Sequence, residues 1–584
     1  MRWSLDSLYT SFESNEFKSD YENFKKEIKK ICLWAENNLA ENTDEVKKME
    51  DYITLLDDFE KYTKLYNYSN LISSVESENE TAIKILDNIE NELTELEKPK
   101  VMFKSFLGSI TNLEEKIESS PILKTHKFIL QEMKNESMYM LSEKEEILLA
   151  KLQTTGSSSW TKQQEQLTAN LAVDITIDNE SKQLPLAKVR SFASNPNANL
   201  RKTAYLAELE SYKKIDKSVA FSLNSIKGEV ITTSKLRGYT SPLEMTLIQS
   251  RMSKKTLDAL LSAIQEFLPV LQKYLKGKSA ILKHKKGLPF HDITAPIGEI
   301  EMKFTYEEAK SFIIKNFSDF SKKLGDFAKM AFDKEWVDAE TRIGKRGGAF
   351  CDNLHAISES RILCNFDGSF GEVLTLAHEL GHAYHGDCLN KESYLNSNYS
   401  MPIAETASTF CENIISKAAL KTATEQEKKV ILENELQDTT QVIIDIFSRF
   451  LFEDEVFKQR ENGPLSVTEL KDIMTRSQIA AYGDALDKEF LHPYMWLCKP
   501  HYYEADYNYY NFPYAYGLLF AKGLYALYLE KGDAFIPLYD DLLKNTGKNT
   551  LEDVAKSAGI DVTSKNFWLS SLKVIEKDVE AFLA

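Results

Sequence analysis

Apolar residues recur at steps of three and four along most of this 584-residue chain, with charged residues between them. That spacing places apolar side chains on one face of an α-helix, whereas a half-buried strand requires alternation at every second position. Residues 255–275 and 306–327 show the helical pattern clearly. Residues 172–177 and 347–357 are the better candidates for strands. The pattern therefore predicts a mostly α-helical protein with few strands.

Loop signals are also few, since the chain has only 22 glycines and 14 prolines. The run Thr-Thr-Gly-Ser-Ser-Ser at residues 154–159 is the clearest loop signal in the first half. Asn-Pro-Asn at residues 195–197 marks a second boundary, after which the helical pattern resumes. We therefore divide the chain into a helical N-terminal region, residues 1–195, and a second region, residues 196–584.

Composition limits the classes of function. The chain carries 72 basic and 89 acidic residues, a net charge of −17, which argues against non-specific nucleic-acid binding. No apolar run approaches the length of a membrane span, and the first residues lack the pattern of a secretion signal. The six cysteines are widely spaced and form no Cys-x-x-Cys pair. We expect a cytoplasmic protein with no nucleic-acid and no membrane partner.

A run of His-Glu-Leu-Gly-His at residues 378–382 carries the most specific chemical pattern in the chain. On a helix, His378 and His382 lie one turn apart on a single face, where two imidazole nitrogens can bind one Zn²⁺. Glu379 lies on the flank of that face, in position to take a proton from the attacking water of a hydrolysis. Histidine is scarce here, with nine in 584 residues, so chance rarely produces this spacing. The run predicts the zinc centre of a hydrolase, in the first place a peptidase.

Local signals place this run on a helix. Ser369 and Glu372 have the spacing of a capping box, and Gly386 is the expected helix end. Leucines and alanines between them supply an apolar side. The alternative is a buried helix whose two histidines are hydrogen-bonded and bind no ion.

The third metal ligand has to come from elsewhere in the chain. His385 lies two turns along the axis from His378, too far to share a tetrahedral ion, so we expect it to pack near the ligands. Glu405 follows Pro402 in a predicted first helical turn and would complete a site of two histidines and one glutamate. Glu412 is the rival ligand, or a partner that orients an imidazole. Glu405 could also be an ordinary acid at a helix start.

Paired glycines interrupt the helical pattern shortly before the histidine run. Gly347, Gly348 and Ala349 would let a backbone approach a ligand closely. An exposed strand edge at this place could bind an extended peptide as an added strand. An ordinary glycine turn explains the pair equally well.

A second cluster of polar aromatic residues lies near the C-terminus. Seven of the 27 tyrosines fall between positions 502 and 516, directly after His501. Tyr507, Tyr510 and Tyr514 are three and four residues apart, so on a helix they would share one face. Phenol and imidazole N–H groups can stabilise the oxyanion of amide hydrolysis. For most of these tyrosines core packing is the better explanation, and the functional hypothesis is kept for His501 and one or two tyrosines of this row.

With both clusters in view, the chain resembles the oligoendopeptidase F branch of the thimet oligopeptidase-like metallopeptidases. The resemblance rests on the opening Trp-Ser-Leu-Asp-Ser-Leu-Tyr at residues 3–9. It rests more specifically on the segments at residues 377–385 and 403–408, which contain the histidine run and Glu405. The order of the motifs along the chain also matches.

The resemblance implies a role for each motif. One Zn²⁺ per chain would be bound by His378, His382 and Glu405, with Glu379 as the catalytic base. The residues expected to support these ligands without binding the ion are His385, Ser408 and Glu412. Among the C-terminal residues, His501 and the tyrosines would hold the substrate and its oxyanion, and the choice between the three tyrosines stays open.

The family fold implies a large helical metallopeptidase with a deep substrate groove and a small β element near the zinc helix. Residues 1–195 would cover the groove, and residues 196–584 would form the zinc-containing catalytic domain. The groove would admit short peptides and exclude folded proteins. The resulting hypothesis is a zinc-dependent oligoendopeptidase that hydrolyses internal bonds of short unfolded peptides.

Three other functions are compatible with parts of the pattern. An exopeptidase would need a basic clamp for a terminal carboxylate, and no arginine near the motifs suggests one. A helical peptide-binding protein without catalysis would be expected to carry a damaged motif. A structural zinc site would favour a closed, cysteine-rich ligand set. The sequence gives no oligomeric state.

Overall fold

The computed structural model describes residues 1–41, 43–298 and 302–584. Helices dominate these residues, as predicted, and their strands form two small sheets. The chain divides into two compact units, each assembled from three segments. The first comprises Met1–Met140, Met302–Lys421 and Leu527–Gly559, and the second comprises Leu141–Glu301, Thr422–Ala526 and Ile560–Ala584. Each unit is built from segments far apart in the chain, so the division into residues 1–195 and 196–584 stays a prediction about sequence regions.

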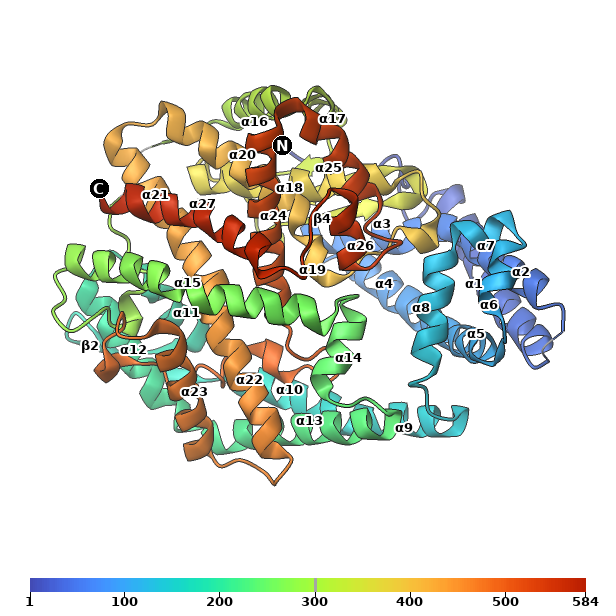
Figure 1. The fold of residues 1–584 in the computed structure, drawn as a ribbon, viewed down its shortest axis with the longest axis horizontal. Helices are drawn as coiled ribbons and strands as arrows, with labels where there is room; N and C mark the ends of the chain where they lie inside the picture. The colour runs from blue at the N-terminus through green and yellow to red at the C-terminus, as the bar shows by residue number, and fades with distance from the viewer. Residues whose placement is uncertain (42, 299–301) are drawn as a thin grey trace. The chain divides into compact units, whose positions relative to one another are not determined.

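The first unit contains both the N-terminal helices and the predicted zinc helix. Figure 1 labels its elements along the chain. They are α1 Asn15–Asn38, α2 Glu45–Phe59, α3 Thr63–Val75, α4 Glu80–Leu93, α5 Glu97–Ser109, α6 Leu113–Glu118, α7 Pro121–Thr125, α8 Lys127–Ser137, α16 Tyr306–Phe320, α17 Lys322–Asp333, β3 Val337–Asp338, β4 Phe350–Leu354, β5 Glu359–Leu363, α18 Phe370–Leu389, α19 Met401–Ala404, α20 Thr406–Thr422, α25 Phe535–Lys544 and α26 Leu551–Ser557.

The second unit holds the remaining helices and a β-hairpin. Its elements are α9 Glu143–Thr155, α10 Ser157–Ala169, β1 Ala172–Ile177, β2 Glu180–Pro185, α11 Leu186–Ser191, α12 Ala198–Tyr212, α13 Asp216–Arg237, α14 Pro242–Gln249, α15 Lys254–Ile281, α21 Glu425–Thr440, a π-helical turn Gln441–Asp445, α22 Ile446–Arg460, α23 Val467–Tyr482, α24 Phe512–Lys531 and α27 Lys565–Leu583. The last residues of α24 belong to the first unit.

A three-stranded sheet in the first unit lies against the predicted zinc helix, α18. Its strand order is β3-β5-β4, with β3 parallel and β4 antiparallel to β5. The strand predicted over residues 347–357 is therefore real but shorter, because His355–Ile357 turns into a 3₁₀ helix. This sheet is the small β element that the family resemblance implied.

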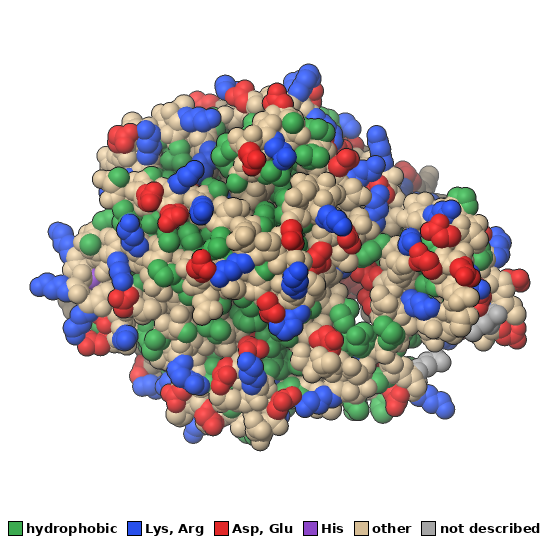
Figure 2. Space-filling view, viewed as in Figure 1, with side chains coloured by type: hydrophobic (Ala, Val, Ile, Leu, Met, Phe, Trp, Pro, Cys, Tyr) green, Lys and Arg blue, Asp and Glu red, His purple; other side chains and the backbone are tan. Residues whose placement is uncertain are grey.

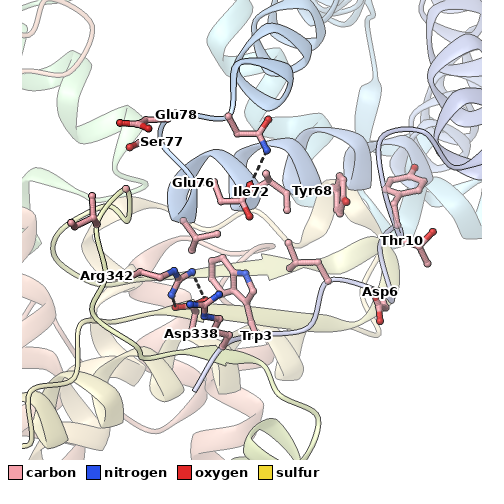
Figure 3. A pocket seen from close by; sticks show the side chains of 17 residues that line it. Trp3, Asp6, Thr10, Tyr68, Ile72, Glu76, Ser77, Glu78, Asp338 and Arg342 are labelled. Atoms are coloured by element: carbon pink, nitrogen blue, oxygen red, sulfur yellow. Dashed lines mark hydrogen bonds and ion pairs between the residues drawn. The ribbon is translucent and has the colours of Figure 1, made fainter.

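The first ten residues are an integral part of the first unit. Figure 3 shows Trp3 and Asp6 facing Tyr68 of α3 across a pocket of about 680 Å³. The bidentate ion pair of Arg342 with Asp338 lies at one side of this pocket, with N–O distances of 2.7 and 3.0 Å. The opening segment that contributes to the family resemblance is thus packed beside the strand that ends at Asp338.

In the second unit, the long helix α15 packs along the C-terminal helix α27 (Figure 1). Helix α15 contains the predicted segment 255–275, and Ser253 caps it by accepting a hydrogen bond from Thr256 N–H at 3.2 Å. The strand predicted at residues 172–177 matches β1, which pairs with β2 through a two-residue turn. Asp178 and Asn179 in that turn have φ of 53° and 65°, as a type I′ turn requires.

Two local predictions differ from the structure. The helical pattern of residues 306–327 spans two helices, because Ser321 is extended and caps α17 through the N–H of Leu324. The loop predicted at residues 154–159 reduces to Gly156, at which α9 ends and α10 begins. Serine and threonine are compatible with helix ends as well as with loops, so composition alone could not separate these cases.

Charges of both signs are interspersed on the face of the molecule shown in Figure 2, with hydrophobic side chains between them. This distribution agrees with the mixed composition of the sequence. Within the part of the chain that the structure describes, no helix combines the length and the apolar composition needed to cross a bilayer.

A buried ion pair in the second unit gives a test of the fold. Lys227 Nζ lies 2.6 Å from Glu453 Oε1, and both side chains are 1% exposed. We expect Lys227→Met to lower the free energy of unfolding by roughly 3–5 kcal/mol, because it leaves a buried carboxylate without its partner. The exposed pair of Lys254 with Asp258 is the matched control, and Lys254→Met should cost less than about 1 kcal/mol.

Urea denaturation measures both variants. A second substitution, Glu453→Met in the Lys227→Met background, should recover most of the loss, since two apolar side chains can replace a buried pair. Equal stability of the two single variants would contradict the assigned burial.

Candidate metal centre and associated residues

Helix α18 carries the histidine run and begins at the predicted cap. Ser369 Oγ accepts a hydrogen bond from Glu372 N–H at 3.3 Å, but Ser369 N–H donates to Asp367 Oδ1 at 2.8 Å. The predicted capping box is therefore only half formed. The predicted helix end at Gly386 is wrong, because α18 continues to Leu389.

Gly386 has a packing role instead. A Cβ atom at this position would lie 2.3 Å from Asn353 Oδ1 on β4. Asn353 Nδ2 donates a hydrogen bond to the backbone oxygen of His382 at 3.3 Å. The glycine thus lets β4 approach the helix closely enough for Asn353 to hydrogen-bond the backbone of His382.

Three side chains converge beside α18. His378 Nε2 and His382 Nε2 are 3.2 Å apart, and Glu405 Oε2 lies 3.2 Å from the first and 3.5 Å from the second. Two ligand atoms of a tetrahedral zinc ion with bonds of about 2.0–2.2 Å stand about 3.3–3.6 Å apart. The three atoms therefore have the mutual spacing that one tetrahedral ion requires.

Close packing of two helices brings Glu405 to the histidines. Glu405 lies at the junction between α19 and α20, directly after the short helix that contains Pro402. A Cβ atom on Gly381 would lie 2.6 Å from both the backbone oxygen of Ala407 and the Cα of Ser408. Only glycine permits this approach of α18 to α20, so the central glycine of the motif sets the position of the third side chain.

Two neighbours support the converging group. Glu412 Oε1 lies 2.8 Å from Nδ1 of His378, on the opposite side of the ring from Nε2. A neutral His378 would donate its Nδ1 proton to Glu412 and leave the Nε2 lone pair for an ion. Ser408 Oγ lies 3.0 Å from Glu405 Oε2. Of the two glutamates considered from the sequence, Glu405 is the one that belongs to the converging group, and Glu412 is the imidazole partner.

The electrostatics of the group are those of paired opposite charges. Burial alone would lower the pKa of His378, but the hydrogen bonds and charges of Glu405 and Glu412 raise this pKa to about 10. Burial would raise the pKa of Glu405, but His378 and His382 hold it well below its usual value. A cation bound here would replace the proton of His378, whereas the Glu405 carboxylate is already ionised.

Glu379 lies on the same helix and is buried, with 6% of its surface exposed. Its Oε2 atom has no hydrogen-bond partner among the described residues. Burial raises the pKa of this carboxyl above its usual value, partly offset by the two histidines. An unpartnered buried carboxylate oxygen is costly in a purely structural role, and a base that exchanges protons would carry this cost for function.

His385 packs away from the converging group. Its Nε2 lies 2.8 Å from Thr546 Oγ1, and its ring stacks on Tyr399 with centroids 4.2 Å apart. The ring is fully buried, and burial lowers its pKa to about 3. His385 therefore anchors α18 to the segment that follows α25, as a neutral imidazole.

The glycine segment before β4 is exposed at Gly347 and Gly348, and a Cβ atom on either would meet nothing within 4 Å. Gly348 has a φ of +80°, which favours glycine. Asn365 Nδ2 fixes the segment by donating to the backbone oxygens of Gly348 and Arg346, at 2.9 and 3.1 Å. Strand β4, which follows Ala349, lies at the edge of its sheet.

The His/Tyr cluster belongs to the second unit. His501 lies in a 3₁₀ turn, Pro500–Tyr503, and its ring stacks on Tyr510 with centroids 4.6 Å apart. The Tyr514 ring lies 6.2 Å from His501 and 6.1 Å from Tyr510. Tyr507 contacts Tyr510 edge-on at 5.4 Å. The four rings therefore form one cluster.

The predicted reason for this clustering is wrong. The three tyrosines do not share a helix face, because α24 begins only at Phe512 and leaves Tyr507 and Tyr510 in the preceding loop. The loop folds back through Tyr509, which has a φ of +51°. Exposure separates the tyrosines as expected: the three in the cluster are half-buried, whereas those packed in the core are Tyr502, Tyr503, Tyr509 and Tyr516.

Several supporting residues were missed from the sequence. Asn511 Oδ1 accepts hydrogen bonds from Arg449 at 3.0 Å and from His501 Nδ1 at 3.1 Å. Ser250 Oγ lies 2.8 Å from the hydroxyl of Tyr507, where burial raises the pKa of the phenol to about 12. No motif marks an asparagine or serine for such a role, since only tertiary contact gives it a partner.

Taken together, the scaffold and the converging group are those of a helical metallopeptidase. A sequence model for Peptidase family M3 matches residues 191–574, and a model for Oligopeptidase F matches residues 110–172. The chain belongs to peptidase family M3 and is an enzyme of that class. The predicted resemblance to oligoendopeptidase F is thereby confirmed.

Named relatives match over most of the chain. Oligopeptidase PepF of Bacillus subtilis is 26% identical over 99% of this chain and 86% of its own length. An oligoendopeptidase F homolog of Borreliella burgdorferi is 26% identical over 97% and 94%. A crystal structure from Chlamydophila abortus shares the fold with a TM-score of 0.85 at 23% identity, covering 100% and 98% of the two chains. Oligoendopeptidase-F from Enterococcus faecium gives a TM-score of 0.71 at 19% identity, covering 97% and 98%.

The close approach at Gly381 gives a test of the centre. We expect Gly381→Ala to push α18 away from α20 and to lower the affinity for zinc by at least about tenfold, because the third ligand would be displaced. Competition with a chromophoric chelator measures this affinity. Gly371→Ala, in the first turn of the same helix, is the control, since its Cβ would meet no atom closer than 3.8 Å. Unchanged zinc affinity in Gly381→Ala would refute the assigned constraint.

Proposed function

We propose that the protein is a zinc-dependent oligoendopeptidase that hydrolyses internal bonds of short unfolded peptides, with one Zn²⁺ per chain. The observation that carries the proposal is the mutual spacing of 3.2–3.5 Å between the nitrogen and oxygen atoms of His378, His382 and Glu405. Two imidazoles and a carboxylate form a donor set typical of catalytic zinc sites, which keep one position open. The membership in a peptidase family supports the same reaction class.

Bound zinc supplies Lewis acidity and lowers the pKa of a water molecule from about 16 to about 7. The chain's own residues then do the rest of the work. Glu379 accepts the proton of the attacking water and passes it to the leaving amide nitrogen. Burial of its carboxyl strengthens its affinity for that proton. Glu412 and Ser408 keep His378 and Glu405 oriented during these transfers.

The peptide itself is proposed to bind in extended form. Strand β4 lies at the edge of its sheet, and the exposed Gly347 and Gly348, followed by the half-buried Ala349, lead into it. An edge strand offers backbone N–H and C=O groups that an added strand can pair with. Recognition through the backbone is independent of side-chain sequence, which suits an enzyme acting on varied short peptides.

For His501 we propose an acceptor role. Asn511 Oδ1 already accepts a hydrogen bond from Arg449, so His501 Nδ1 must be the donor in its own contact with this oxygen. Burial, together with the charges of Arg449 and Lys499, lowers the pKa of His501 and favours the neutral ring. Its Nε2 is then an acceptor for a substrate N–H. The oxyanion donors would accordingly be hydroxyls of Tyr507, Tyr510 or Tyr514.

The cytoplasmic location and the exclusion of folded substrates remain parts of this proposal. An exopeptidase is the alternative within the same chemistry. To separate the two, peptides blocked at both ends and folded proteins are incubated with the enzyme, and products are identified by mass spectrometry. We expect internal cuts in the short peptides only, abolished by chelation and restored by zinc. Cleavage restricted to peptides with a free terminus would favour the exopeptidase.

The role of Glu379 has a direct test. Glu379→Gln preserves size but removes the base, so kcat should fall by about 100- to 10,000-fold. Zinc content should stay at one ion per chain, since this residue is not among the converging ligands. The measurement pairs peptide hydrolysis with metal analysis. A variant that retains zinc and cleaves at the normal rate would remove the base from the mechanism.

The tyrosine that stabilises the oxyanion can be identified by three single variants. Of Tyr507→Phe, Tyr510→Phe and Tyr514→Phe, we expect one to lower kcat by about 100-fold or more, with KM and zinc content little changed. The other two serve as matched controls because they remove a hydroxyl from the same cluster. If none lowers kcat by tenfold, the cluster does not stabilise the transition state.

A further inference from the structure

A cavity of about 220 Å³ lies within the second unit, outside the residues assigned to catalysis. Helices α11, α12, α21, α22 and α23 contribute to its lining, together with the π-helical turn and the segment leading to His501. Its charged lining residues are Arg190, Arg201, Glu208, Asp445, Arg449 and Lys499. Four cationic side chains thus face two carboxylates.

Three of the four cationic side chains form ion pairs with carboxylates, and the fourth does not. Arg201 Nε lies 2.7 Å from Asp292 Oδ1, just behind the lining, and Arg190 Nε lies 3.4 Å from Glu208 Oε1. The guanidinium of Arg449 is likewise paired with Asp445, at 2.5 Å. The side chain of Lys499 has neither an ion pair nor a hydrogen bond among the residues that the structure describes, and only its backbone oxygen is engaged, by Tyr502 N–H. Its ammonium is therefore the uncompensated charge of the cavity.

Unpartnered buried nitrogen atoms point to an occupant as well. Arg449 is 6% exposed, and its Nε has no hydrogen-bond partner in the described part of the chain. The same holds for Nδ1 of His291 and of His492, whose side chains also line the cavity. A buried guanidinium N–H without a partner is costly, so a ligand that accepts a hydrogen bond from Arg449 would be stabilised here. The imidazole Nδ1 atoms donate or accept according to their tautomer, and a neutral His492, whose Nε2 lies 3.4 Å from Glu208 Oε1, presents Nδ1 as an acceptor.

The rest of the lining selects between anions. Val189, Ile293 and Met495 present apolar surface to the same space. Inorganic phosphate offers oxygen on every side and would leave this surface against polar atoms. A small organic carboxylate combines an anionic head for the cations with a short hydrocarbon part for the apolar wall.

The cavity is connected to the His/Tyr cluster through one shared side chain. Arg449 Nη1 donates to Asn511 Oδ1 at 3.0 Å, and the same oxygen contacts His501 Nδ1 at 3.1 Å. Lys499 is also the residue directly before the 3₁₀ turn that carries His501. A ligand that binds Arg449 and Lys499 would therefore affect His501 in two ways, through the hydrogen bonds of Asn511 and through the backbone next to its 3₁₀ turn.

We propose that this cavity is a regulatory site for a small organic carboxylate, held by Lys499 and by Nε of Arg449. Binding neutralises the ammonium that faces Arg449 and completes the hydrogen bonds of the guanidinium. Arg449 then holds Asn511, and through it His501, in a fixed position. The regulatory part rests on the proposed peptidase function and predicts a higher kcat in the presence of the carboxylate.

Binding is tested on the full-length zinc-loaded protein with propionate as the probe, at fixed ionic strength maintained with sodium chloride. We expect one binding site per chain by calorimetry and a higher thermal transition temperature, because a ligand that binds the folded state stabilises it. Lys499→Met should weaken binding by at least about tenfold, whereas Lys499→Arg should retain it because the charge is kept. Lys488→Met, at an exposed lysine of the same unit, is the control and should bind as the wild type does.

These readouts do not depend on activity, so they separate this proposal from the peptidase assignment. Absence of propionate binding to the wild-type protein at tens of millimolar would overturn it, even if Lys499→Met fails to fold. Tighter binding of inorganic phosphate than of propionate would overturn the choice of a carboxylate. Binding with an unchanged kcat in the wild type, under conditions where peptides are cleaved, would overturn the regulatory part.

Discussion

The close approach of α18 to α20 is the constraint on which the metal centre depends. A tetrahedral ion tolerates only a narrow range of distances between its ligands, and the proposed third ligand, Glu405, lies outside α18, between α19 and α20. Gly381 makes the approach possible, since a Cβ atom there would lie 2.6 Å from the backbone of the facing helix. Gly386 does the same on the side of the sheet. Because they lack a Cβ atom, the two glycines let β4 and the segment after Glu405 pack closely against the helix that carries the histidines.

Charge compensation maintains this arrangement. His378 lies between two carboxylates, with Glu405 at Nε2 and Glu412 at Nδ1. Glu405 could contact a cation bound at Nε2, while Glu412 keeps the imidazole ring oriented through Nδ1. Glu379 stands apart because one of its oxygens lacks a partner among the described residues. Helix α18 thus carries a histidine oriented by a carboxylate, His378, next to the proposed base Glu379, which has an unpartnered oxygen among the described residues.

In the second unit, hydrogen bonds orient His501 as Glu412 orients His378. Arg449 satisfies Asn511, and Asn511 fixes the proton of His501 on Nδ1. On this basis we propose His501 as an acceptor rather than the expected donor, and the hydroxyls of the neighbouring tyrosines as the donors. The cavity beyond Arg449 contains a half-buried cation, Lys499, whose side chain has no ion-pair partner among the described residues. Our two proposals for this unit thus rest on one chain of contacts.

Local patterns were enough to predict the helical class, the strand at residues 172–177 and the helical position of the histidine run, because each is encoded in a short period or spacing. The residues by themselves also indicated a peptidase and offered Glu405 as a ligand with Glu412 as its rival, and the family resemblance favoured Glu405. Only the tertiary structure placed Glu412 at Nδ1 of His378. Glu405 and Glu412 are seven residues apart and would share one helix face, so their spacing alone could not separate their positions. The structure also showed that Gly386 permits close packing of β4 on the helix, and that the tyrosines cluster through a loop. Such outcomes depend on which surfaces pack together across long sequence separations, and no local pattern records that.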